Sequence, residues 1–300
     1  MEYQIWLNGE YVDRDKAQIP MLDRGFRIGD VVFDTSRTFN GTVFKLRDHL
    51  DRLYRSLKYV RIDPGMSIDE MERLTLDVVA HNEDLRREMN DDYMITQIVT
   101  GGNGQRGDTD PNVSIWIDPL GAPRWAHAYG GGAHAVIPKT RAYPSEALDP
   151  KVKHYSRLNF VLAEMEARDV DQNAMPIMLD MDGKVSEGTG ANFFIVTDGT
   201  LRTPRDSSTL QGVSRLTVIE IADTLGIPAI EDDLQPYDLY TADEAFFCST
   251  PYSILPVGRI DNRELGDDAP GPITNQLLAA WSERVGLDIV DQLLRLAKTQ

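Results

Sequence analysis

The sequence of 300 residues has a single cysteine, Cys248, and no long apolar run. One cysteine excludes an internal disulfide and is typical of proteins in a reducing compartment. No stretch reaches the roughly 20 apolar residues of a membrane-spanning helix, and residues 1–10 lack the basic and apolar segments of a secretion signal. We therefore expect a cytoplasmic protein with no membrane partner.

Positive charge is scarce as well, because 31 Lys and Arg against 48 Asp and Glu give a formal net charge of −17 at pH 7. This charge repels the phosphate backbone of nucleic acids, so we expect no nucleic-acid partner. The remaining composition, with 41% hydrophobic and 26% charged residues, is ordinary for a globular protein. A chain of this length suffices for one large domain or two modest ones.

Metal-binding and hydrolase motifs are also missing. The chain lacks the His-Glu-x-x-His motif of metalloproteases and the nucleophile elbow of serine hydrolases. We therefore expect no metal ion and no hydrolase activity. The histidines show no metal-site spacing, and they are His49, His81, His127, His134 and His154.

Helix and strand signals alternate in the first part of the chain. Asn8-Gly9 is typical of a β-hairpin turn, and Ser67 with Glu70 forms a capping box that predicts a helix start. Strands are expected over residues 31–39 and 93–100 because both runs are rich in β-branched and aromatic residues.

A break in this alternation divides the chain. Residues 119–132 carry glycine and proline at both ends and have no hydrophobic period, which is typical of a flexible connection. We therefore predict a small N-terminal domain over residues 1–118, an interdomain linker over residues 119–132 and a larger domain over residues 133–300.

Residues 102–107 match the dinucleotide-binding pattern Gly-x-Gly-x-x-Gly. We reject this interpretation because such a loop must open a helix, whereas Asp108 to Pro111 adds negative charge and a helix breaker. The segment is more typical of a glycine loop, in which Arg106 is the only cation.

One lysine precedes a strongly periodic segment. Leu158, Val161, Leu162 and Met165 recur at helical spacing and predict a helix that packs through this apolar face. Lys153 comes just before it, so we expect the packed helix to hold its amine in place. A lysine kept out of water loses its charge readily, and the neutral amine forms a Schiff base (aldimine) with an aldehyde.

A glutamate occupies a turn in the next segment. Two strands are expected over residues 176–179 and 185–196, and Glu187 lies where glycines interrupt the second. Pyridoxal phosphate (PLP) needs a lysine for its aldehyde and an acidic partner for its ring nitrogen. Lys153 and Glu187 can supply these two groups. The alternative for either residue alone is an ordinary surface charge.

Two segments resemble the signature of the fold-type IV PLP enzymes, the class IV aminotransferases. Residues 153–159 read Lys-His-Tyr-Ser-Arg-Leu-Asn, and residues 185–193 read Val-Ser-Glu-Gly-Thr-Gly-Ala-Asn-Phe. The family includes branched-chain aminotransferases, D-amino acid aminotransferases, (R)-selective amine transaminases and aminodeoxychorismate lyases. The resemblance implies an α/β (α+β) fold with a smaller N-terminal α/β domain and a larger C-terminal domain around a mostly β, barrel-like core.

The resemblance also implies roles for individual residues. Lys153 would carry PLP and move the proton, and Glu187 would bind the ring nitrogen. The phosphate would be held by Arg52, Val213, Ser214 and Thr250. Substrate-binding positions implied by the family pattern are Phe33, Arg37, Tyr93, Arg106 and Pro251.

Some of these positions also have a physical argument or an ordinary alternative. Residues 212–214 precede a predicted helix, whose first N–H groups and dipole favour an anion. The alternative there is a plain serine cap. Arg52 lies outside the centre of its helix's apolar face, so its alternative is a solvated side chain.

The function implied is transfer of an amino group between an amino donor and a 2-oxo acid. The resemblance implies an active site that lies between two subunits, so we expect a homodimer. Three alternatives remain: an aminodeoxychorismate-lyase-like activity, an L-branched-chain amino acid aminotransferase, and a non-catalytic binding protein on the same fold. Intact Lys153, Glu187 and Arg52 argue against the last of these.

Substrate choice depends on a few positions near the proposed pocket. L-branched-chain enzymes carry Tyr-x-Arg where this chain reads Tyr93-Met94-Ile95, and D-amino acid enzymes add a loop histidine that is missing beside Arg106. Residues 30–33 and 44–49 look closest to the (R)-amine transaminases, so we favour (R)-amines or D-amino acids. Arg157 stands where relatives often place an aromatic or apolar side chain.

Overall fold

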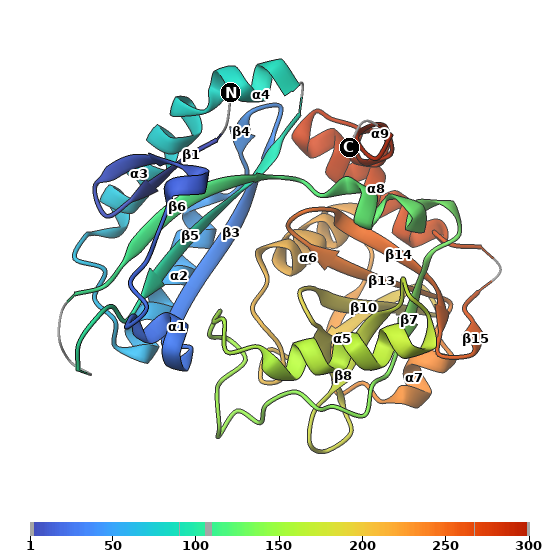
Figure 1. Cartoon of the computed structure of the whole chain (residues 1–300). Helices are drawn as coiled ribbons and strands as arrows, with labels where there is room; N and C mark the ends of the chain where they lie inside the picture. Colours follow the sequence, from blue (N-terminus) through green and yellow to red (C-terminus); the bar gives the residue numbers. More distant parts are fainter. Residues whose placement is uncertain (1–2, 90, 106–109, 267, 299–300) are drawn as a thin grey trace. The chain divides into compact units, whose positions relative to one another are not determined.

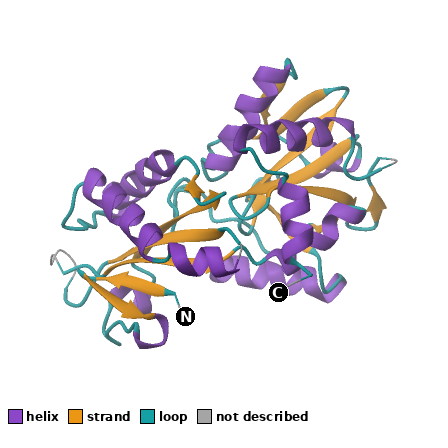
Figure 2. Ribbon diagram, turned by 90° about the horizontal axis from the view of Figure 1, so that it is seen from above, coloured by secondary structure: helices purple, strands orange, loops and turns teal. Residues whose placement is uncertain are grey.

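The computed structural model describes residues 3–89, 91–105, 110–266 and 268–298. It confirms the mixed α/β fold class, and Figure 2 shows helices and strands interleaved throughout the chain. The chain divides into two compact units, which we call the first and second unit. The first consists of Met1–Leu120 and Val152–Arg157, and the second of Gly121–Lys151 and Leu158–Gln300.

This grouping differs from the expected division in one respect. Val152–Arg157, which contains Lys153, belongs to the first unit although it lies beyond residue 133 in the sequence. The domain limits at residues 118 and 133 themselves stay a prediction.

The first unit is built on a six-stranded antiparallel sheet with the order β2-β1-β6-β5-β3-β4. Helices α2 and α3 contact this sheet, as Figure 1 shows. The strands are β1 (Gln4–Leu7), β2 (Glu10–Asp13), β3 (Val31–Phe39), β4 (Thr42–Val43), β5 (Tyr93–Thr100) and β6 (Val113–Pro119). The helices are η1 (Arg14–Lys16), α1 (Arg24–Ile28), α2 (Leu46–Val60), α3 (Ile68–His81) and α4 (Glu83–Met89).

Local signals account for several of these elements. Asn8 and Gly9 both have positive φ, 48° and 102°, as the tight turn between β1 and β2 requires. Ser67 and Glu70 form the predicted capping box at the start of α3, with both reciprocal bonds present. These predictions are confirmed.

The core of the first unit lies between the sheet and α2 and α3. The strand period places alternate residues on this face, including Val32 on β3 and Ile95 on β5, both fully buried. Helix α2 contributes a row of buried leucines, which are Leu46, Leu50, Leu53 and Leu57.

The second unit contains a nine-stranded mixed sheet with the order β12-β11-β10-β13-β14-β7-β8-β9, and β15 pairs with β14. Strand β9 also contacts β10 and β11, so the sheet curls towards a barrel, as expected. The strands are β7 (Ala133–Val136), β8 (Met175–Leu179), β9 (Val185–Gly188), β10 (Asn192–Thr197), β11 (Thr200–Pro204), β12 (Ala229–Asp232), β13 (Glu244–Ser249), β14 (Ser253–Ile260) and β15 (Arg263–Glu264). The helices are η2 (Ala122–Arg124), η3 (Ala126–Gly130), α5 (Leu158–Val170), α6 (Val213–Leu225), α7 (Pro236–Tyr240), α8 (Pro272–Val285) and α9 (Ile289–Leu296).

Strands β10 and β13 form the centre of this core. Phe193 lies opposite Phe247 and Phe194 opposite Phe246, with ring centroids 5.0 and 5.1 Å apart. All four rings are fully buried. The aromatic pairs fix the register of the two strands, and Asn192 therefore lies opposite Cys248 where β10 begins.

Helix α5 forms as predicted, but the expectation that it packs through its apolar stripe is wrong. Leu158, Val161, Leu162 and Met165 are 70%, 50%, 47% and 57% exposed. The residues that α5 buries are small or polar, namely Asn159, Ala163 and Ala167.

In the described part of the chain, none of the helices is long and apolar enough to cross a membrane.

Candidate active site

The backbone of Lys153 is held by β3 and α2. The amide of Phe33 donates to the carbonyl of Lys153 at 3.0 Å, and the amide of Lys153 donates to Ser56 Oγ on α2 at 3.2 Å. An isolated bridge between Val32 and His154 extends this pairing. The predicted positioning of Lys153 therefore comes from the first unit rather than from the helix that follows it.

The side chains of Phe33 and Lys153 lie together. The Lys153 amine is 4.6 Å from the centroid of the Phe33 ring, and the Arg157 guanidinium carbon is 5.0 Å from it. Tyr155 stacks on the same ring with centroids 3.8 Å apart. Cations over an aromatic face are attracted by its quadrupole, so Phe33 orients both. Arg157 thus neighbours the lysine, which its position in the sequence left open.

His154 has no positive charge at neutral pH. Burial, together with the positive charges of Arg157 and Lys153, lowers the pKa of His154 to about 4. Its Nδ1 accepts a hydrogen bond from the amide of Ser156 at 3.1 Å, which places the ring proton on Nε2.

Arg52 forms a buried ion pair. Its Nε and one terminal nitrogen donate to the two oxygens of Asp34 on β3, each at 2.8 Å, and His49 Nδ1 lies 2.7 Å from the same carboxylate. All three side chains are buried, Asp34 completely. Burial acts to raise the pKa of Asp34, but the charge of Arg52 and the bonds from His49 and Arg52 outweigh it, so the net shift is downwards.

The solvated alternative for Arg52 is therefore wrong. Asp34 and His49 were missed by the sequence interpretation, although His49 and Arg52 stand one helical turn apart on α2. That spacing places both side chains on one face of the helix and was the available signal.

Arg37 and Tyr93 lie on opposite faces of the first sheet. Arg37 is opposite Met94, and residues directly opposite share a face, so Tyr93 points to the other side. Arg37 is buried with its guanidinium carbon 3.9 Å from the centroid of the Phe39 ring. Phe33 shares the Arg37 face because four residues separate them along β3.

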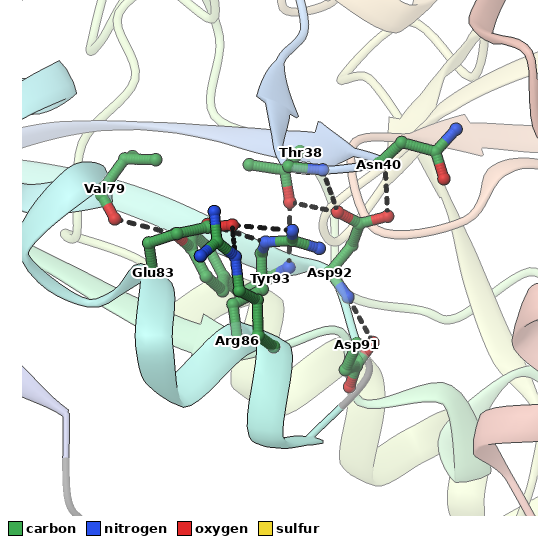
Figure 3. Close-up of polar contacts among 10 residues, drawn as sticks. Thr38, Asn40, Val79, Glu83, Arg86, Asp91, Asp92 and Tyr93 are labelled. Atoms are coloured by element: carbon green, nitrogen blue, oxygen red, sulfur yellow. Dashed lines mark hydrogen bonds and ion pairs between the residues drawn. The ribbon is translucent and has the colours of Figure 1, made fainter.

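Tyr93 belongs to the core beneath α3. Its hydroxyl donates to the carbonyl of Val79 at 3.1 Å, and its amide donates to Thr38 Oγ1 at 3.1 Å. Figure 3 shows these contacts beside Asp92, which accepts from Thr38 and from the amide of Asn40. These bonds account for the burial of Tyr93 without a ligand, and its substrate-binding role stays a prediction.

Arg106 lies outside the described residues. The part of its loop that is described is anchored by Arg24, whose guanidinium donates to the carbonyls of Gly104 and Gln105 at 3.3 and 2.8 Å. Arg24 is in turn paired with Asp30 at 2.9 Å. Arg24 was not singled out in the sequence because nothing local indicates that it contacts a loop 80 residues away.

In the second unit, the Glu187 carboxylate is an acceptor for several hydrogen-bond donors. Its Oε2 atom accepts from Thr209 Oγ1 at 2.8 Å, from the amide of Leu210 at 3.0 Å and from Asn192 Nδ2 at 3.1 Å. A carboxylate with several donors is favoured in its ionised form. Glu187 is therefore not a simple surface charge on a hairpin.

The start of α6 lacks a side-chain cap. Gly212 is the N-cap residue, and Val213 and Ser214 are the first two helical residues. The plain serine cap is therefore wrong for Ser214. The first turn keeps the N–H groups and the dipole that favour an anion, with both residues buried beside it.

Thr250 and Pro251 lie in the turn between β13 and β14. Ser249, at the end of β13, donates through Oγ to the carbonyl of Gly190 at 2.6 Å and so ties this turn to the loop after Glu187. A cavity of about 160 Å³ opens here. Its lining includes Pro251, Tyr252, Gly190, Arg124, Glu164 and Arg168.

The side chains of both units match the chemistry of PLP. The second unit offers a fixed carboxylate for a ring nitrogen, and a helix N-terminus for a phosphate. The first unit offers an amine for an aldehyde and an arginine for a phosphate. Among the residues that the structure describes, no group of His, Cys, Asp and Glu could hold a metal ion.

Comparisons with known proteins agree with this chemistry. Residues 31–260 match the family described as amino-transferase class IV. The chain is 36% identical to a putative branched-chain-amino-acid aminotransferase of Methanocaldococcus jannaschii over 96% of this chain and all of that one. It is 30% identical to a D-alanine aminotransferase of Listeria monocytogenes over 94% of this chain and 96% of that one.

A solved structure shows the same fold. The branched-chain aminotransferase of Thermoproteus uzoniensis, crystallised with norvaline, superposes with a TM-score of 0.85 and 32% identity, covering 95% of this chain and 96% of that one. This likeness covers both units and confirms the expected fold.

Proposed function

Because the chain belongs to the class IV aminotransferases, which are PLP enzymes of fold-type IV, we propose that Lys153, Glu187 and Arg52 hold its cofactor. The protein is a transaminase that moves an amino group between an amino donor and a 2-oxo acid. Arg52, Val213, Ser214 and Thr250 would bind the phosphate.

Each residue has a distinct task in this proposal. When bound, PLP supplies the electron sink that makes the α proton of an amino donor removable. The Lys153 amine would hold the cofactor through its aldehyde and would move the proton at the donor's α carbon. Glu187 holds a proton on the ring nitrogen. Phe33 and Tyr155 orient the lysine and shield it from water.

The observation that carries this proposal is the setting of Lys153. Its backbone is bonded on two sides, and its amine lies over the ring of a predicted substrate residue, Phe33. A solvated lysine, which was the alternative, has no such contacts. Aminodeoxychorismate-lyase-like chemistry is not better supported than transamination.

The test is the half-reaction with an amino donor alone. Loss of the cofactor's visible absorbance on adding an amino acid or amine, and its return on adding a 2-oxo acid, is the expected result. Absorbance that stays unchanged with every donor of both configurations would contradict transamination. Lys153→Ala is the control, since it removes the amine that moves the proton.

For the substrate, we propose an amino acid with an apolar side chain. The support is the naming of relatives as branched-chain aminotransferases over nearly the whole chain. D-amino acids and (R)-amines are the second candidate, because a D-alanine aminotransferase is a relative at 30% identity. A panel of L-leucine, D-alanine and an (R)-amine with one acceptor separates the two.

We also propose a homodimer. The α5 stripe, defined as Leu158, Val161, Leu162 and Met165, is exposed on the second unit. Contiguous apolar surface of this kind marks a protein interface. The first unit has a comparable apolar segment, with exposed Ile19, Met21, Leu22, Phe26 and Ile28. A second copy of the chain would cover such surfaces.

Light scattering tests the dimer. The protein should have about twice the 33.7 kDa of one chain, and Leu162→Glu should lower the mass because it places a charge in the interface. Asp182→Asn, an exposed change in the turn between β8 and β9 and outside the α5 stripe, is the control. Full activity at the mass of one chain would contradict the proposal.

The proposed location is the cytoplasm. The single cysteine, Cys248, is buried, and burial raises the pKa of its thiol, so it stays protonated and unreactive. A chain with one buried cysteine cannot form an internal disulfide, so an oxidising compartment would not stabilise it. Fractionation of the source cells, with activity in the soluble fraction, is the direct measurement.

A further inference from the structure

Asn192 connects three parts of the second unit. Its Nδ2 donates to Thr209 Oγ1 and to the carbonyl of Leu210, both at 2.8 Å, and reaches Glu187 Oε2 at 3.1 Å. Asn192 and Thr209 are buried. Because the Thr209 oxygen accepts from Asn192, its hydroxyl hydrogen is free to point at Glu187 and donates a hydrogen bond to it.

This arrangement acts on the charge of Glu187. The Thr209 hydroxyl and the Leu210 amide each donate a full bond to Oε2, and Asn192 Nδ2, whose two protons also go to Thr209 and Leu210, shares one of them with it. Each hydrogen bond to a charged oxygen is stronger than one between neutral groups. All three donors favour the ionised carboxylate. They also fix its direction, since the bonds come from β10 and from the segment before α6.

The other side of Asn192 contacts the start of α6. A Cβ atom added to Gly212 would lie 1.9 Å from Asn192 Oδ1, which is far inside contact distance. Gly212 has an ordinary φ of −68°, so it is close packing against Asn192, rather than backbone conformation, that requires glycine here. Asn192 therefore spans the space between Glu187 and the N-cap of α6.

We propose that Asn192 and Thr209 are positioning residues of the cofactor site. Together they keep Glu187 ionised, and Asn192 also sets the spacing between this carboxylate and the helix N-terminus that receives the phosphate. The inference rests on the proposed roles of Glu187 and α6. Neither residue touches the reacting atoms, so both act through Glu187 and Gly212.

The two residues should have different signatures. Thr209→Val keeps the shape of the side chain but removes one donor to Glu187, so the ring nitrogen of bound PLP should hold its proton less tightly. We expect its pKa to fall and the amine half-reaction to slow about tenfold. Affinity for PLP should change less than about twofold.

Asn192→Ala should affect both ends of the cofactor. The ring nitrogen should again lose its proton more readily, and affinity for PLP should also fall about tenfold because the spacing to α6 is lost. Gly212→Ala should reproduce this second effect, since the added methyl displaces Asn192, while the bonds from Thr209 and Leu210 to Glu187 remain. Thr209→Ser restores the hydroxyl and should restore wild-type behaviour.

The experiment is nitrogen NMR of holoenzyme reconstituted with PLP labelled with ¹⁵N at the ring nitrogen, together with PLP titration. We expect a protonated ring nitrogen in the wild type and in Thr209→Ser. In Thr209→Val and Asn192→Ala, the ¹⁵N signal of the ring nitrogen should move downfield, as it does when the ring loses its proton. If Thr209→Val and Asn192→Ala both fold, keep a protonated ring nitrogen and bind PLP with wild-type affinity, this inference is wrong, while the proposed role of Glu187 stands.

A neutral ring nitrogen in the wild type is a separate outcome. It would show that Glu187 does not hold the ring proton, and the proposed role of Glu187 and this inference would fail together. Circular dichroism of each variant establishes folding. If Asn192→Ala does not fold, Thr209→Val and its rescue by Thr209→Ser still test whether these residues keep Glu187 ionised. Gly212→Ala then tests whether Asn192 sets the spacing between Glu187 and α6.

Discussion

Arg52 and Glu187, one in each unit, are held in opposite ways. In the first unit, Arg52 is buried against a full countercharge, Asp34, which also contacts His49. In the second unit, Glu187 is held by neutral donors from Thr209, Leu210 and Asn192. A buried ion pair is costly to break because it leaves a charge without compensation, whereas each neutral donor contributes a smaller, separable amount.

This difference suggests a division of labour. The buried ion pair of Asp34 and Arg52 contributes to stability, so breaking it should unfold the protein before it alters chemistry. The second unit fixes a single charge by several weaker bonds, so changes there should alter chemistry while the fold persists. The following predictions test this contrast, beginning with the largest effect.

Asp34→Asn should destabilise the protein by about 3–5 kcal/mol, because it leaves Arg52 buried without its partner charge. Chemical denaturation measures the free energy of unfolding. Asp51→Asn on α2, whose side chain is 47% exposed and pairs weakly with Arg47, is the matched control and should change it by less than about 0.5 kcal/mol. Equal stability of the two variants would remove the contrast between the units.

Glu187→Gln should leave the fold and bound cofactor in place but slow the amine half-reaction about 100-fold, or about 2.7 kcal/mol, because the amide cannot hold the ring proton. Stopped-flow absorbance follows this half-reaction. A wild-type rate in the variant would show that Glu187 has only a structural role.

The pH dependence of stability should reflect His154. Its pKa is about 4 in the folded chain and about 6.5 when unfolded. Between these values the unfolded chain binds the proton and the folded chain does not. The free energy of unfolding should therefore fall as pH drops from about 6.5 to about 4, by about 1–2 kcal/mol after allowing for solvent screening of this half-buried group.

The measurement is denaturation of the apoprotein across this range. His49, whose pKa burial also lowers, titrates in the same direction, so the informative quantity is the difference between wild type and His154→Gln. Parallel pH profiles of the two proteins would show that folding does not lower the pKa of His154.

Local sequence signals were sufficient for much of the fold. Asn8-Gly9 and the Ser67 capping box depend only on neighbouring residues. Such signals are readable because their physics is contained within a few residues.

Features that depend on distant contacts were not predicted. The spacing of the α5 stripe shows that one face is apolar, but not whether the chain itself covers it. The face on which Tyr93 lies depends on strand register, since a shift of one residue reverses it. Thr209 contacts Glu187 from 22 residues away, and nothing in its own neighbourhood indicates this.

The central claim is that Lys153, held by β3 and α2 of the first unit, is the residue that binds the cofactor. Borohydride reduction of the yellow holoenzyme, followed by peptide mapping, tests it most directly because reduction converts the lysine–cofactor bond into a stable amine. The account predicts the cofactor mass on the peptide that contains Lys153 and none in Lys153→Ala. Labelling of any other lysine in the wild-type protein would contradict it.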